Sequence, residues 1–309
     1  MKPAVRDLYA AMLQRDLDEV RELSAAWLAK GEDRDLFDAV SRFTALAFNP
    51  SQHGKHAFLA AVAAGELREV LGERWGGLLI ECAVYAASGR LPWSEAPMFE
   101  PPPAEPGRDA TREAIRNAVA VSDLAAAERW LAAKLGESSL AADYFRTARE
   151  APGEAGGPLI TAVACWKLSG AQNHHPSWPV LRAALVEWCG SPRGASTPPI
   201  DDRDPAERAM AVAAKLEAER GSIEVLHELL FLDADLESSR LLSGEPAVAL
   251  QVEMKDSVYP LARDFAAYLL AHPAAGRLAA RFPEIDPEAI LDSCRYNLEH
   301  SSWEDWSFG

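Results

Sequence analysis

The chain has 309 residues, of which 49% are hydrophobic and 25% charged, a composition that is typical of folded globular proteins and excludes an intrinsically disordered chain. Its formal net charge of −16 argues against nucleic acid and anionic membranes as main partners, because binding to either needs clustered lysine and arginine. We therefore expect a neutral or basic protein or peptide partner, and the alternative is a charge that serves solubility alone.

The N-terminus and the cysteines predict a cytoplasmic protein. Residues 1–7 carry Lys2, Arg6 and Asp7 where a secretory signal needs an apolar run. The most apolar later stretch, residues 76–89, is interrupted by Glu81 and is shorter than the roughly 20 apolar residues of a membrane span. The four cysteines lie far apart without metal-binding spacing, and we expect buried thiols in a reducing compartment: Cys82, Cys165, Cys189 and Cys294.

Helical periodicity runs along almost the whole chain, and the alternation typical of strands is nearly absent. Asp16 opens a helix with a capping-box pattern that Gly31 ends, and a second helix after Asp33 closes at Asn49-Pro50. Later helix starts are marked by a capping residue or by proline at the first helical position: Asp204-Pro205, Ser222, Glu245-Pro246, Tyr259-Pro260 and Asp286-Pro287. These signals predict an all-α fold of about a dozen helices.

Two stretches about a hundred residues apart resemble each other. Asp16 and Asp123 each open a helix that glycine follows, and each stretch ends in an apolar helix led by a tryptophan, Trp75 or Trp178. Stacked copies of such a unit bury an apolar face that neither buries alone. We therefore predict tandem repeat units, two connectors and a divergent helical C-terminal section, in this order: unit 1 at 1–91, a Pro-rich connector at 92–107, unit 2 at 108–190, a connector at 191–205 and the C-terminal section at 206–309.

Two residue pairs match fragments of metal sites. His53 and His56 lie three residues apart at a helix start, a spacing at which two imidazoles can bind one metal ion; the alternative is a polar, exposed helix start. Glu224 and His227 form an E-x-x-H step of the kind that di-iron bundles use twice. No second step is present, so a surface helical pair is the alternative.

Common catalytic motifs are absent from the sequence, which contains no P-loop, no dinucleotide fingerprint after a strand, no H-E-x-x-H and no G-x-S-x-G. The glycine-rich residues 153–157 precede a helix without a strand before them, which indicates a helix connection. The acidic run of Asp233, Asp235 and Glu237 lacks the ligand order of a calcium loop, and we interpret it as a solvated helix end.

Tryptophan is frequent, with nine residues, and gives the candidates for ligand contact. Trp75 and Trp178 lie in apolar helical stripes, which are either core or the wall of a ligand cavity. The C-terminal residues 301–309 alternate Trp303, Trp306 and Phe308 with acids. We expect this tail to dock on its own chain or to bind a partner.

Three stretches of the chain, Leu79 to Pro92, Gly157 to Gly170 and Leu181 to Trp188, resemble the paired helices of questin oxidase-like proteins. The resemblance implies an all-helical fold and an oxidase that acts on a polycyclic aromatic substrate. In that family a histidine tends to stand close to such a helix start. Here the first copy offers His53 and His56, whereas the second has Gly156-Gly157-Pro158.

Two functions from different classes follow from the sequence. The first is a non-enzymatic binding or scaffold protein that holds a polypeptide or a basic protein partner in a groove between the repeats. An immunity or inhibitor protein would be one version of it. The second is a helical oxidoreductase that binds an aromatic substrate between the repeats, with a metal ion at His53 and His56. The sequence identifies no cofactor.

Overall fold

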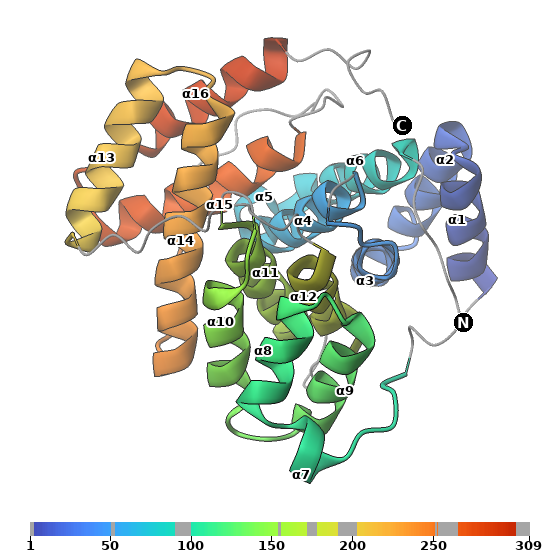
Figure 1. The fold of residues 1–309 in the computed structure, drawn as a ribbon. Coiled ribbons are helices and arrows are strands. Elements are labelled where there is room, and N and C mark those ends of the chain that lie inside the picture. The colour runs from blue at the N-terminus through green and yellow to red at the C-terminus, as the bar shows by residue number, and fades with distance from the viewer. Residues whose placement is uncertain are drawn as a thin grey trace.

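The computed structural model describes residues 3–50, 53–89, 100–153, 156–171, 178–190, 203–250, 252 and 265–300, without the side chains of residues 53, 223 and 297–300. These ranges contain sixteen α-helices and no strand (Figure 1), which confirms the all-α prediction. No described helix combines the length and the apolar character that a membrane span requires.

The helices follow one another in three sections. The N-terminal section contains α1 (Pro3–Gln14), α2 (Leu17–Leu28), α3 (Asp33–Leu46), α4 (His53–Glu66), α5 (Arg68–Leu71) and α6 (Trp75–Ser88), with a 3-10 turn at Gly72–Arg74. The middle section contains α7 (Pro106–Asp109), α8 (Arg112–Ala120), α9 (Leu124–Lys134), α10 (Leu140–Glu150), α11 (Gly157–Ala171) and α12 (Trp178–Gly190). The C-terminal section contains α13 (Pro205–Ala218), α14 (Ile223–Ser243), α15 (Phe265–Arg281) and α16 (Pro287–His300).

Side-chain caps fix most of the predicted helix starts. Asp16 accepts a hydrogen bond from the Glu19 amide at 3.0 Å, and Ser222 caps α14 in the same way through the amide of Val225. The predicted start at Glu245-Pro246 is wrong: α14 ends at Ser243, Gly244 caps it with a φ of 71°, and residues 245–250 have no regular secondary structure. The predicted start at Tyr259-Pro260 lies outside the described residues.

The turns before α2 and α9 share a conformation that L-residues rarely adopt. Arg15 has a φ of 60° and Ser122 a φ of 59°, and each precedes an aspartate whose side chain caps the next helix. The amides of Asp16 and Asp123 both bond back to the carbonyl five residues earlier, in α1 and in α8. These matched turns support the predicted tandem repeat, which itself remains a prediction.

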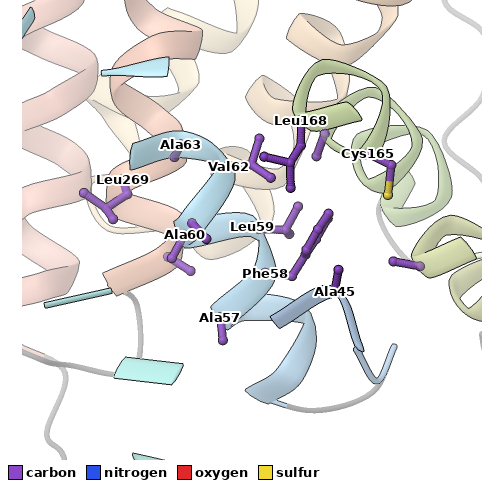
Figure 2. Packing of buried hydrophobic residues seen from close by; sticks show 14 of the residues in the cluster. Ala45, Ala57, Phe58, Leu59, Ala60, Val62, Ala63, Cys165, Leu168 and Leu269 are labelled. Carbon is purple, nitrogen blue, oxygen red and sulfur yellow. The ribbon is translucent and has the colours of Figure 1, made fainter. Parts of the chain in front are cut away.

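Helix α4 lies at the centre of the molecule (Figure 1) and packs against α3, α6, α11 and α15. Every residue from Ala57 to Ala64 is at most 4% exposed, because small alanines let neighbouring helices approach on all sides. Figure 2 shows Leu269 of α15 on one side of α4 and Leu168 of α11 on the other. One helix of the N-terminal section therefore carries contacts to both other sections.

The C-terminal section lies against the first two, because α15 packs on α4 while α14 packs on α10 and α11. Pro273 lies inside α15 and is buried, and the helix continues past it to Arg281. At the junction of α4, α11, α14 and α15, charged side chains from all three sections pair with one another.

Candidate functional site

A cavity of about 720 Å³ lies at this junction, which makes it large enough for a small-molecule ligand or a short stretch of peptide. Its lining comes from five helices, α4, α5, α11, α14 and α15, and from the segment after α14. Its lining residues are Glu66, Glu69, Val70, Trp166, Lys167, Gly170, Glu237, Arg240, Leu241, Ala247, Val248, Ala249, Leu250, Val252 and Arg277.

The lining is amphipathic. Trp166 of α11 packs against Tyr144 and Phe145, with ring centroids 5.6 and 5.4 Å away, and it is partly exposed and lines the cavity. Leu241 of α14 and the chain after Pro246 add further apolar surface. A ligand with an apolar body can therefore be desolvated against this wall.

Arg277 of α15 organises the charged floor. Its Nε and one terminal nitrogen bind the two carboxylate oxygens of Asp233 at 2.8 and 2.6 Å, and the other terminal nitrogen binds Glu66 Oε1 at 2.7 Å. Only 5% of Arg277 is exposed, so these ion pairs form largely out of water. Planar two-point pairing of this kind fixes direction as well as charge, and it ties α15 to both α14 and α4.

Lys167 and Glu237 extend the network. Lys167 Nζ lies 2.8 Å from Glu66 Oε1 and 3.1 Å from Glu237 Oε2, which links α4, α11 and α14. Glu237 also pairs with Arg240 at 3.1 Å and with Arg281 at 2.7 Å. The Arg240 side chain reaches on to the carbonyl of Glu245 at 2.7 Å and so anchors the start of the segment that lines the cavity.

Three groups of this network, Glu66, Glu237 and Arg277, have pKa values that favour their charged forms. Burial would raise the pKa of Glu66, but the charges of Arg277 and Lys167 outweigh it and lower that pKa. In the same way burial is outweighed at Glu237 by Lys167, Arg277 and Arg240, which lower its pKa to about 2. Arg277 itself is held protonated, since Asp233 and Glu66 overcome the effect of its burial on the pKa.

The acidic run of α14 is thus misread as a solvated helix end in the sequence. Asp233 is 7% exposed and Glu237 is 2% exposed, and both lie in the middle of α14, which continues to Ser243. Asp235, between them, pairs with Arg149 of α10 at 2.9 Å and with Arg208 of α13 at 3.4 Å. Each acid of the run pairs with a cation from another helix. Because these cations lie far away in the sequence, the sequence around the run gives no sign of the pairing.

The metal candidates do not form a group with further ligands in the described residues, where no three His, Cys, Asp or Glu side chains are placed to hold a metal ion. His53 is the first residue of α4 and its side chain lies outside the description, while His56 is exposed. Glu224 is exposed and accepts a hydrogen bond from Ser222 Oγ at 3.2 Å; His227 is half-buried. A shared metal at these pairs remains a prediction.

Two of the four tryptophan candidates are core residues. Trp75 is 2% exposed, donates its indole N–H to the carbonyl of Ala64 at 2.7 Å and packs on Phe37 with ring centroids 5.6 Å apart. Trp178 is 5% exposed, and neither ring lines the cavity. The structure gives both a packing role, while Trp303 and Trp306 lie outside the described residues.

Sequence reasoning missed the residues that do line the cavity, above all Trp166, Lys167 and Arg277. A signal for two of them exists. Lys167 and Arg277 are isolated charges within apolar helices, as Glu66 is at the end of α4, and such charges are buried only when paired. Nothing local identifies their partners, which lie up to 211 positions away along the chain.

The four cysteines are buried and unpaired as disulfides, as the sequence predicts. Burial raises the pKa of Cys189 and Cys294 to about 12, and it raises the pKa of Cys82 and Cys165 further still. A thiol in this state carries little thiolate at neutral pH and is a poor nucleophile.

Comparison of the chain with protein-family models, with curated proteins and with solved structures found no match. The likeness to questin oxidase-like proteins therefore stays an expectation from the sequence.

Proposed function

We propose that the protein is a non-catalytic binding protein whose amphipathic ligand occupies the cavity between α4, α11 and α14. The observation that carries this proposal is the cavity of about 720 Å³, which lies where the two predicted repeat units meet the C-terminal section. A groove between the repeats is the place where the sequence predicts a ligand. The size favours a small molecule or the end of a polypeptide over a folded protein partner.

The state of the charged groups supports binding over catalysis. A general acid or base works best with a pKa near the operating pH. The buried carboxylates Glu66 and Glu237 have lowered pKa values and pair with cations, so they stay ionised at neutral pH. Such a network positions helices and a ligand, but it neither accepts nor gives up a proton at neutral pH.

The oxidoreductase of the sequence interpretation stays as a second candidate on one observation. Trp166 lines the cavity, and an aromatic substrate would pack against its ring. Measurement of the metal and the chromophore bound to the purified protein distinguishes the oxidoreductase from the binding protein. A stoichiometric metal or chromophore that disappears in the His53→Ala/His56→Ala variant would favour the oxidase.

The binding proposal is tested with a neutral apolar dye, N-phenyl-1-naphthylamine, whose fluorescence rises in apolar sites. Gly170 lies in the cavity lining, and a Cβ built there meets nothing within 4 Å, so the backbone position has room for a side chain, and Gly170→Leu is chosen to reduce the space in the cavity. Gly77 of α6 has the same open surroundings away from the cavity, and Gly77→Leu is the matched control. Both changes replace a helical glycine and favour the helix by up to about 1 kcal/mol.

We expect saturable binding of the dye to the wild type and to Gly77→Leu, and at least tenfold weaker binding to Gly170→Leu. Equal binding to all three proteins would place the dye elsewhere and refute the cavity as the site. Circular dichroism of both variants establishes that they are folded as the wild type is.

A further inference from the structure

The charged side chains that line the cavity balance one another. Three are cations and three are carboxylates: Lys167, Arg240 and Arg277 against Glu66, Glu69 and Glu237. Glu66 and Glu237 already pair with these cations. A ligand with a net charge would therefore lose water in the cavity without meeting a net charge of opposite sign. Uncharged hydrogen-bonding groups of the lining are thus left to select the ligand.

The chain after α14 contributes four consecutive residues to the lining, residues 247–250, which we call the lining segment. Its approach is fixed on the helix side. Gly244 ends the helix with a φ of 71°, and the Arg240 side chain donates a hydrogen bond to the carbonyl of Glu245 at 2.7 Å. Pro246 then pushes the residue before it toward extended backbone. The chain is therefore directed away from helical geometry before it reaches the cavity.

Burial alternates along the lining segment. Ala247 and Ala249 are exposed, whereas Val248 and Leu250 are partly buried, and Val252 beyond them is partly buried as well. A period of two is that of an extended chain, in which successive side chains point to opposite faces. The lining segment therefore has the character of a single strand without a neighbour.

The backbone of the lining segment is available for pairing. No described residue exchanges a hydrogen bond with the backbone N–H or C=O groups of residues 247–250. In an extended chain, successive residues direct these groups to opposite edges, so each edge presents a row of donors and acceptors. A ligand that displaces water from such an edge has to replace the hydrogen bonds that water made. Another extended backbone supplies donors and acceptors at the matching spacing.

We infer that the ligand of this cavity is a polypeptide segment, an end or an exposed loop of another protein, that binds in extended conformation and pairs its backbone with residues 247–250. Its apolar side chains are desolvated by the apolar lining, which includes Trp166 and Leu241. Basic residues that flank the bound stretch suit an exterior of net charge −16. The inference rests on the proposed binding function and specifies its ligand class.

The test uses the peptide acetyl-Lys-Val-Thr-Leu-Thr-Val-Lys-amide, which has no terminal charges and is kept soluble by its lysines. Isothermal titration calorimetry measures its binding to the wild type. One analogue is N-methylated at both threonines, and the other at the leucine and at the valine two residues after it. These two sets of amides lie on opposite edges of an extended peptide, and methylation removes their donors. We expect one analogue to bind at least tenfold more weakly than the parent peptide, and the other to bind within threefold of it.

Two variants make the same comparison on the protein. Val248→Pro and Ala249→Pro each remove one backbone N–H, and these two groups point to opposite edges of an extended chain. One variant should bind the parent peptide at least fivefold more weakly than the wild type, and the other should bind it within twofold. Both should bind N-phenyl-1-naphthylamine as the wild type does, which establishes that the cavity is intact.

Three results would overturn the inference. Two methylated analogues that bind alike, whether tightly or weakly, would show that the edge of the peptide does not matter, and two proline variants that behave alike would show the same for the protein. A parent peptide that does not bind the wild type would overturn it too, because backbone pairing does not depend on the peptide's side chains. None of these results touches the binding proposal, which fails only if the dye binds Gly170→Leu as it binds the wild type.

Discussion

Replacement of Arg277 by methionine tests the network at the base of the cavity. The variant removes a side chain with three charge-assisted hydrogen bonds and leaves Asp233 buried without its two-point partner, while Glu66 keeps Lys167. Methionine fills much of the same space, so the main effect is a stranded charge. Loss of one partner from a buried ion pair costs about 3–5 kcal/mol, and we expect the free energy of unfolding in urea to fall by that amount.

Two variants show whether the stranded charge is the cause. Arg281 lies one turn further along α15, is 20% exposed and has one partner, Glu237, which keeps Lys167 and Arg240. Arg281→Met should therefore cost about 1 kcal/mol or less. Adding Asp233→Leu to Arg277→Met should recover more than half of the loss, because the buried charge is removed. An Arg277→Met variant within 1 kcal/mol of the wild type, or a double variant worse than the single one, would refute the reasoning.

Three more predictions follow from burial and charge. The pKa of Glu237 is lowered from 4.5 to about 2 in the folded state, so its ionised form stabilises the fold above about pH 4.5, and this stabilisation is lost as the pH falls toward 2. The melting temperature should therefore be constant from pH 7 to 5 and fall below pH 4.5. A melting temperature that stays constant down to pH 2.5 would contradict this prediction. The four buried thiols should react with a thiol reagent only after denaturation, and a thiol that reacts fast in the native protein would contradict this prediction. If Trp303 and Trp306 dock on the chain, deletion of residues 301–309 should lower the melting temperature by several degrees. If the tail is a binding element, the deletion should abolish partner binding at an unchanged melting temperature. A deletion that changes neither the melting temperature nor partner binding would contradict both alternatives.

Local signals in the sequence were sufficient for the fold class and for many helix ends. Asp16, Asp123, Asp204 and Ser222 cap helices where the sequence predicts starts, since a cap involves only residues two or three positions apart. Glu245-Pro246 was misleading for the same reason. Proline there is compatible with a helix start, but the chain after Gly244 runs along the cavity with no regular structure.

Such signals could not identify most of the site, because its residues come from five helices in three separate parts of the sequence. Asp233 looks like a surface acid until Arg277 is placed beside it, and that pairing depends on how α14 packs on α15. Trp75 looks like a candidate for ligand contact, yet its indole N–H donates to the carbonyl of Ala64 in α4. Tertiary packing, which no local pattern encodes, decides which charges and rings face a cavity and which face the core.

The central claim, that a ligand occupies the cavity at the junction of the three sections, is tested most directly by a crystal structure of the protein grown with saturating N-phenyl-1-naphthylamine. We predict density for the dye between Trp166 and Leu241, above the Lys167 ammonium. Dye bound only elsewhere on the protein, with the cavity holding none, would contradict the claim.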